Sequence, residues 1–82
     1  MQILYKTEAV KNLKKLSAAE KQKAKKKIES LLSNPLAGKK LKGEFSDLRS
    51  LRAWPLRIIY LFNPKSQTII IITVDYRGNV YK

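Results

Sequence analysis

The chain contains neither cysteine nor histidine. Without cysteine, a disulfide framework and a thiolate metal site are both excluded. Without histidine, the protein lacks the side chain that most often serves as a general base or as a metal ligand. Its six acidic residues are scattered singly, without the close pair that a glycosidase or a metal site uses. We therefore expect no metal and no cofactor.

Long apolar runs are also absent. No stretch of the sequence approaches the roughly 20 apolar residues that a membrane-spanning helix needs. The first residues, MQILYKTEAV, lack the apolar core and the small-residue cleavage site of a signal peptide. We therefore expect a cytoplasmic protein that folds as a single domain over residues 1–82.

Positive charge is what the chain has in excess. Eighteen lysines and arginines against six acidic residues give a net charge of +12. Such a surplus favours an anionic partner: nucleic acid, an acidic membrane surface or an acidic protein. The arginines all lie in the second half of the chain, at residues 49–77, whereas the lysines concentrate in the first half. This segregation indicates a localised site as well as a solvated, lysine-rich surface.

The first half of the chain predicts two short helices after a β-like segment at Gln2–Lys6. Thr7 is placed to cap the first helix, because its hydroxyl can accept a bond from an unpaired backbone amide. Ser17 and Glu20 have the S-x-x-E spacing of a capping box and begin the second helix. Pro35 requires this helix to end before it. With almost no linker between them, the two helices should form a hairpin against one face of a sheet.

Residues 48–60, LRSLRAWPLRIIY, predict a β-hairpin that turns at Trp54-Pro55. A two-residue turn places Arg52 directly opposite Arg57, on the same face of the sheet. Like charges in that position are destabilising unless an anion lies between them, and the planar guanidinium group suits phosphate. The pair is either a phosphate-binding element or two surface arginines that splay into water. Proline at the second central position of a two-residue turn is disfavoured unless its peptide bond is cis. A turn of more than two residues is therefore the alternative, and it would change the Arg52–Arg57 pairing.

Residues 68–76, TIIIITVDY, are rich in β-branched side chains and predict a further strand. We pair it antiparallel to the second hairpin arm, with Phe62 opposite Thr68. Alternation then brings Arg77 to the face that carries the arginine pair, with Asp75 beside it. Asp75 is placed to orient an arginine or to act as a weak base.

The same register predicts an apolar patch. Two helices cover only one face of the sheet, so isoleucine and leucine side chains on the other face should stay exposed and bind a partner protein. The residues of this predicted patch are Ile59, Leu61, Ile69 and Ile71.

Other residues near the arginine face are suited to nucleic acid. A basic loop over residues 36–46 is typical of a contact to a phosphate backbone, or it serves only solubility. Trp54 at the hairpin tip and Tyr81 in the tail are suited to stacking on a splayed base, or they are ordinary edge aromatics. The candidate nucleic-acid-binding residues are Lys39, Lys40, Lys42, Arg49, Arg52 and Trp54.

The order of elements and four segments together resemble the RelE/ParE superfamily of bacterial toxins from type II toxin–antitoxin pairs. The segments are TEAVKNLKKL, SNPLAGKKLKG, LRSLRAWPLRIIY and VDYRGNVY. The resemblance covers nearly the whole chain. It implies an α+β fold in the order β-α-α-β-β-β, with the helical hairpin on one face of an antiparallel sheet. It also implies an acidic, partly disordered antitoxin that folds on contact.

In the RelE branch, the resemblance implies a ribosome-dependent endoribonuclease. The mRNA 2′-hydroxyl attacks the neighbouring phosphate and leaves a 2′,3′-cyclic phosphate. Arg57 and Arg77 correspond to arginines that stabilise the phosphate charge, and Tyr81 corresponds to a tyrosine that stacks on the mRNA base. Leu48 and Ser50 stand where that branch has two lysines, one of which serves proton transfer. The residues that could replace them are Arg49, Arg52, Lys40 and Lys42.

Two alternatives stay open. The ParE branch uses the same scaffold to poison DNA gyrase and does not need those lysines. A member of the superfamily that binds only its antitoxin or RNA is the third possibility.

Overall fold

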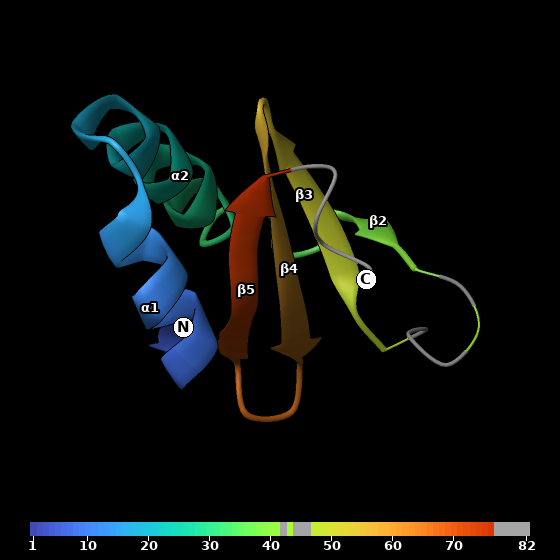
Figure 1. Cartoon of the computed structure of the whole chain (residues 1–82). Helices are drawn as coiled ribbons and strands as arrows, with labels where there is room; N and C mark the ends of the chain where they lie inside the picture. Colours follow the sequence, from blue (N-terminus) through green and yellow to red (C-terminus); the bar gives the residue numbers. More distant parts are fainter. Residues whose placement is uncertain (42, 44–46, 77–82) are drawn as a thin grey trace.

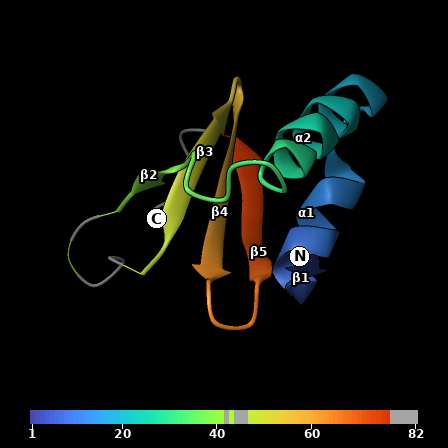
Figure 2. The same ribbon diagram turned by 180° about the vertical axis from the view of Figure 1, so that it is seen from behind.

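The computed structural model describes residues 1–41, 43 and 47–76. The elements are β1 (Gln2–Tyr5), α1 (Thr7–Lys15), α2 (Ala18–Ser30), β2 (Lys39–Lys40), β3 (Arg49–Ala53), β4 (Leu56–Asn63) and β5 (Thr68–Tyr76). The strands form one sheet in the order β1-β5-β4-β3-β2. Helix α1 packs along β5, and α2 packs against β3 and β4 (Figures 1 and 2). Among the described residues, neither helix is long and apolar enough to cross a membrane.

The predicted α+β class, with a helical hairpin packed on a sheet, is confirmed. Two details differ. The first strand pairs parallel to β5, so the sheet is mixed and not antiparallel throughout. The predicted loop over residues 36–46 contains β2, which pairs with β3 through only Lys39 and Lys40. A strand of two residues is too short to show alternation in the sequence.

Both helices begin where the sequence indicates, but only the second has a side-chain cap. The Ser17 hydroxyl accepts a bond from the Glu20 amide at 3.2 Å, and the Glu20 carboxylate accepts one from the Ser17 amide at 3.3 Å. The predicted capping box is therefore confirmed. The prediction of Thr7 as a cap is wrong, because Thr7 is already helical and Lys6 takes the cap position without a side-chain bond.

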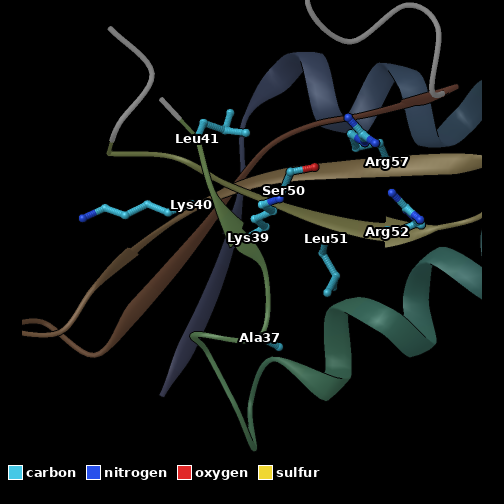
Figure 3. Close-up of a pocket in the computed structure, with 8 residues that line it drawn as sticks. All are labelled: Ala37, Lys39, Lys40, Leu41, Ser50, Leu51, Arg52 and Arg57. Atoms are coloured by element: carbon cyan, nitrogen blue, oxygen red, sulfur yellow. The ribbon is translucent and has the colours of Figure 1, made fainter. Parts of the chain in front are cut away.

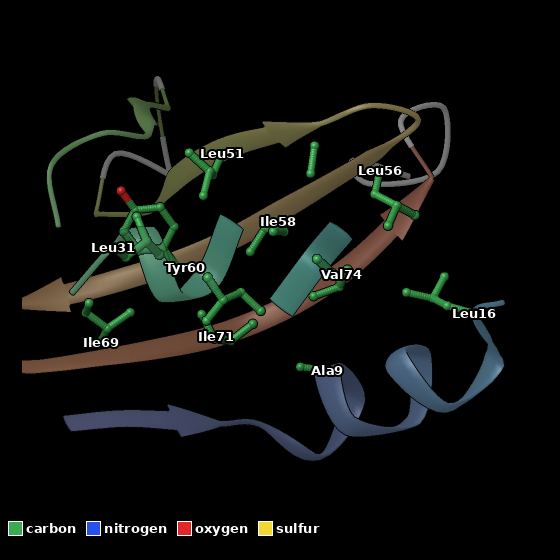
Figure 4. Close-up of a cluster of buried hydrophobic side chains, with 13 residues drawn as sticks. Ala9, Leu16, Leu31, Leu51, Leu56, Ile58, Tyr60, Ile69, Ile71 and Val74 are labelled. Atoms are coloured by element: carbon green, nitrogen blue, oxygen red, sulfur yellow. The ribbon is translucent and has the colours of Figure 1, made fainter. Parts of the chain in front are cut away.

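The core lies between the helices and one face of the sheet (Figure 4). Large aliphatic side chains from β4 and β5 meet those of the helices there, and each contributes about 1.5–3 kcal/mol when fully buried. The buried cluster consists of Ala9, Leu16, Ala24, Ile28, Leu31, Leu51, Ala53, Leu56, Ile58, Tyr60, Ile69, Ile71 and Val74.

The turn between β4 and β5 sets a register one residue away from the predicted one. Asn63, and not Phe62, lies opposite Thr68. The Asn63 side-chain oxygen accepts bonds from the amides of Lys65 at 3.0 Å and Ser66 at 3.3 Å, so this residue begins the turn. Because side chains alternate along a strand, a shift of one residue moves the paired side chains to the opposite face.

An irregularity in the ladder then restores the predicted facing of the side chains near the hairpin tip, although the pairing there is two residues away from the predicted one, with Arg57 opposite Asp75. Tyr60 lies opposite Ile71, whereas Ile59 lies opposite Thr73, which leaves Ile72 as an additional residue on β5. This is the geometry of a β-bulge, which inserts one residue into one strand of an antiparallel pair. The core-facing residues of β5 are therefore Ile69 and Ile71 before the bulge and Val74 after it.

The shifted register and the bulge overturn the predicted apolar patch. Ile69 and Ile71 are fully buried in the core and face the helices. Ile59 lies on the other side of β4 but is only 3% exposed. Only Leu61 of the predicted set is partly exposed. The four residues thus do not form an exposed surface.

The register can be tested with two neighbouring isoleucines. Ile71→Ala should lower the free energy of unfolding by about 2–5 kcal/mol, because it empties a fully buried position. Ile70→Ala should cost clearly less, because Ile70 faces the opposite side and is only partly buried. Urea denaturation followed by circular dichroism measures both. A larger loss for Ile70→Ala than for Ile71→Ala would contradict the register.

Candidate functional site

The predicted hairpin register is confirmed. Ala53 lies opposite Leu56, and Arg52 lies opposite Arg57. The turn has two residues, and its Trp54–Pro55 peptide bond is cis. The two arginines therefore share one face of the sheet, which is the face turned away from the buried Leu56.

The two arginines line a pocket of about 560 Å³ that is formed by residues of β2, β3 and β4 (Figure 3). Lys39 on β2 lies opposite Ser50 on β3, so these two side chains share the arginine face. The Leu51 side chain points to the other side of the sheet, toward α2. The residues that line the pocket are Ala37, Lys39, Lys40, Leu41, Ser50, Leu51, Arg52 and Arg57.

The charged groups that line this pocket come from β2, β3 and β4, and Asp75 on β5 lies next to them. Arg57 on β4 stands between Arg52 on β3 and Asp75 on β5, which is its direct partner across the β4–β5 ladder. Asp75 accepts a hydrogen bond from the backbone amide of Tyr76 at 2.7 Å. Asp75 thus lies beside Arg57, and its role as an orienting group or a weak base stays a prediction. The arrangement offers two planar guanidinium groups and at least one ammonium group to an anion.

Arg49 does not belong to this group. Three residues before Arg52, it lies on the opposite face of β3, because side chains alternate along a strand. Its Nη1 donates to the carbonyl oxygen of Gly38 at 2.9 Å and to that of Leu36 at 3.5 Å. The structure therefore places Arg49 against the segment before β2 and not in the pocket that Lys39, Lys40 and Arg52 line.

The remaining candidates divide into two groups. Trp54 is 61% exposed at the hairpin tip, and its carbonyl oxygen accepts a bond from the Lys23 ammonium at 2.8 Å. This contact ties the tip to α2. Lys42, Arg77 and Tyr81 lie outside the described residues, so their roles stay predictions.

A further contact anchors the end of β5, from which Arg77 follows in sequence. The Tyr76 hydroxyl donates to the Glu20 carboxylate at 3.0 Å. The backbone amide of Ser17 and the Tyr76 hydroxyl, in that order, lower the pKa of Glu20. The same bond to Glu20 is the main cause of the raised pKa of Tyr76. The capping box of α2 is thereby joined to the last described residue of the sheet.

Ser50 is a pocket residue that the sequence does not single out as a binding residue. In the sequence it is notable only as a serine where the RelE branch has a lysine. The available signal is its parity, because Ser50 and Arg52 are two residues apart on one strand and therefore face the same side.

The chain belongs to the family of ParE-like toxins of type II bacterial toxin–antitoxin systems, whose model matches residues 3–82. It is thus a toxin of the RelE/ParE family. No curated protein sequence matches the chain.

Solved structures show the same fold. A chain of the toxin–antitoxin complex RelBE2 from Mycobacterium tuberculosis is 27% identical, with 93% of this chain and 96% of that chain covered and a TM-score of 0.85. A chain of the archaeal RelE–RelB complex from Pyrococcus horikoshii OT3 is 26% identical, with 96% and 97% covered and a TM-score of 0.76. The YoeB/ParE toxin from Agrobacterium tumefaciens is 19% identical, with 94% and 99% covered and a TM-score of 0.83, and supports the fold alone.

The anchor at Tyr76 predicts an acid-sensitive contribution to stability. The pKa of Glu20 is lower in the folded chain than the ordinary value of 4.5. The contribution is therefore complete above that ordinary value and is lost as the pH falls through the lower folded-state pKa. Glu20→Gln should flatten the dependence of Tm on pH over this acidic range, as measured by circular dichroism melts.

Glu8→Gln provides the control, because Glu8 is also a first-turn carboxylate but belongs to α1, which has no side-chain cap. It should keep more of the native pH dependence than Glu20→Gln. Identical pH profiles for the native chain and Glu20→Gln would contradict the anchor.

Proposed function

We propose that this toxin is a ribosome-dependent mRNA endoribonuclease. One observation carries the proposal: Arg52 and Arg57 lie directly opposite each other at a pocket that Lys39 also lines. A phosphodiester accepts bonds from guanidinium groups in a planar fork geometry. Its negative charge grows when it is attacked, and the stabilisation of such charge usually contributes more to catalysis than any other effect.

The reaction needs no metal in this scheme. The mRNA 2′-hydroxyl attacks the adjacent phosphorus, a new P–O bond forms, and the bond to the 5′-oxygen breaks. The 2′-hydroxyl gives up its proton and the leaving 5′-oxygen gains one, so the products are a 2′,3′-cyclic phosphate and a 5′-hydroxyl. Arg52 and Arg57 hold the phosphate charge throughout.

Lys39 is the candidate for proton transfer within the described part of the site. The RelE-like pattern has lysines where this chain has Leu48 and Ser50, so an ammonium group is missing from β3. Lys39 lies opposite Ser50 on the adjacent strand and presents an ammonium group on the same face. A group within hydrogen-bond reach of the leaving oxygen serves as a general acid. In this proposal, Lys39 on β2 provides the ammonium group that is missing from β3.

Removing either arginine should slow cleavage. Arg57→Ala and Arg52→Ala should each lose about 2–4 kcal/mol of transition-state stabilisation, by analogy with the loss of one oxyanion-hole donor. Primer extension on mRNA in purified ribosome complexes measures the rate. Lys65→Ala is the control, because it removes a positive charge in the β4–β5 turn, at the opposite end of β4 from the hairpin tip. Full activity in both arginine variants would exclude this site.

Poisoning of DNA gyrase is the second candidate. The description of the matching family as ParE-like favours it, and so do Leu48 and Ser50 at the lysine positions of the RelE branch. Incorporation of labelled methionine and thymidine after induction in cells separates the two functions. Early loss of translation supports mRNA cleavage, and early loss of DNA synthesis supports gyrase poisoning. Loss of neither supports a member that only binds.

The partner we propose is an acidic antitoxin. Two of the three similar structures reported above come from toxin–antitoxin complexes. In this chain, a groove of about 450 Å³ lies between α1 and α2, with an apolar floor and a basic rim. It suits an acidic amphipathic segment that folds on contact, and it replaces the patch predicted from the sequence. The groove is lined by Tyr5, Val10, Leu13, Lys14, Lys21, Lys25 and Ile28.

A charge placed in this groove should weaken antitoxin binding. Val10→Asp puts a carboxylate on the apolar floor, and we expect at least a tenfold loss of affinity, about 1.4 kcal/mol. Leu32→Asp is the matched control, because Leu32 is 46% exposed and lies outside the groove. Isothermal titration of a purified acidic antitoxin peptide measures both. Arg57→Ala in the same titration shows whether the antitoxin also contacts the phosphate pocket.

A further inference from the structure

Tyr60 is a core residue whose hydroxyl makes two hydrogen bonds to the backbone. The side chain is completely buried on β4 (Figure 4). The hydroxyl donates to the carbonyl oxygen of Pro35 and accepts a bond from the amide of Gly38, both at 2.8 Å. One oxygen therefore holds Pro35 and Gly38, the two ends of the last four residues before β2 in the segment that follows α2. Figure 2 shows this segment crossing toward β2 over the side of the sheet that α2 covers.

Gly38 fits this contact because it has no side chain. A Cβ atom at this position would lie 2.6 Å from Cε1 of Tyr60 and 2.7 Å from its hydroxyl oxygen. The Gly38 carbonyl oxygen accepts the 2.9 Å bond from Arg49 described above. Both polar backbone groups of Gly38 are thus engaged by side chains that come from β4 and β3. We call this set of contacts between Tyr60, Pro35, Gly38 and Arg49 the Tyr60 latch.

The Tyr60 latch is directly adjacent in sequence to the pocket, because Gly38 is followed by Lys39. Strand β2 itself contributes only two residue pairs, which is too little for a strand to hold its own place. Lys39 is also exposed and stands near Arg52 and Arg57, and neighbouring like charges repel. Without an anchor, the ammonium group would move away from the guanidinium pair. The buried hydroxyl of Tyr60 opposes that movement.

We propose that Tyr60 is a positioning residue of the phosphate pocket, which acts through Gly38 to keep Lys39 beside the arginine pair. The inference rests on the proposed function in taking an RNA phosphate as the ligand. Tyr60 itself faces the core and does not contact that ligand. Its loss therefore acts only through the placement of Lys39.

The test uses the salt dependence of binding to a short single-stranded RNA oligonucleotide. Each phosphate contact by a cation contributes about 0.7 to the slope of log K against log salt for single strands. Lys39→Ala should lower the slope by this amount. Tyr60→Phe should lower it equally, and the double variant should show no further decrease. Thr68→Val, which removes a hydroxyl bond to a backbone carbonyl at the far turn, should leave the slope unchanged.

A merely structural role for Tyr60 would give different results. Tyr60→Phe would then weaken binding without changing the slope, or would weaken it equally with and without Lys39, and either outcome overturns the proposal. Gly38→Ala is a second variant that should reproduce Tyr60→Phe, because its methyl group meets the Tyr60 ring. Hydrogen exchange by NMR gives an independent measurement: unchanged protection of the Gly38 amide in Tyr60→Phe would also overturn the latch.

The outcomes separate this inference from the proposed function. If the slopes behave as expected but ribosome-bound mRNA stays intact, the latch stands and the endoribonuclease proposal fails. If Lys39→Ala leaves the slope unchanged, the latch proposal fails, and the cleavage assay still decides the function.

Discussion

The alternation of side chains along β4 determines both the core and the candidate site. Leu56, Ile58 and Tyr60 are at most 1% exposed, and Arg57 between the first two must face the other way. Burying three large side chains contributes about 1.5–3 kcal/mol each. A like-charged pair across two strands costs only about 0.2–1 kcal/mol. Core burial therefore fixes the register, and the register in turn forces Arg57 against Arg52.

Local signals in the sequence predicted the parts of the fold that local interactions determine. The capping box of Ser17 and Glu20 and the hairpin turn at Pro55 each depend on a few consecutive residues, and both are confirmed. The register of β5 could not be predicted in the same way. Four consecutive isoleucines fill either face of a sheet equally well, so the pattern Ile69–Ile72 does not distinguish a regular ladder from a bulged one. The apolar patch failed for this reason.

Only the part of the candidate site that depends on the alternation of side chains along the hairpin strands could be predicted from the sequence. Parity along the hairpin is enough to place the arginine pair together and could have added Ser50. It could also have removed Arg49, which is three residues from Arg52. The place of Lys39 depends on the path of the chain after α2, which the buried hydroxyl of Tyr60 holds through Gly38. No periodicity in the sequence encodes a contact between residues 22 positions apart.

The position of the Lys39 ammonium group matters for the choice between the two proposed activities, mRNA cleavage and gyrase poisoning. A guanidinium pair binds a phosphate or an acidic side chain equally well, so Arg52 and Arg57 alone suit either a nuclease or a protein-binding toxin. Cleavage also needs a proton donor at the leaving oxygen. In the reaction we propose, that donor is Lys39 on β2, a strand of two residues. Under the proposed function, the step from binding to cleavage therefore depends on whether the segment before β2 holds Lys39 beside the arginines.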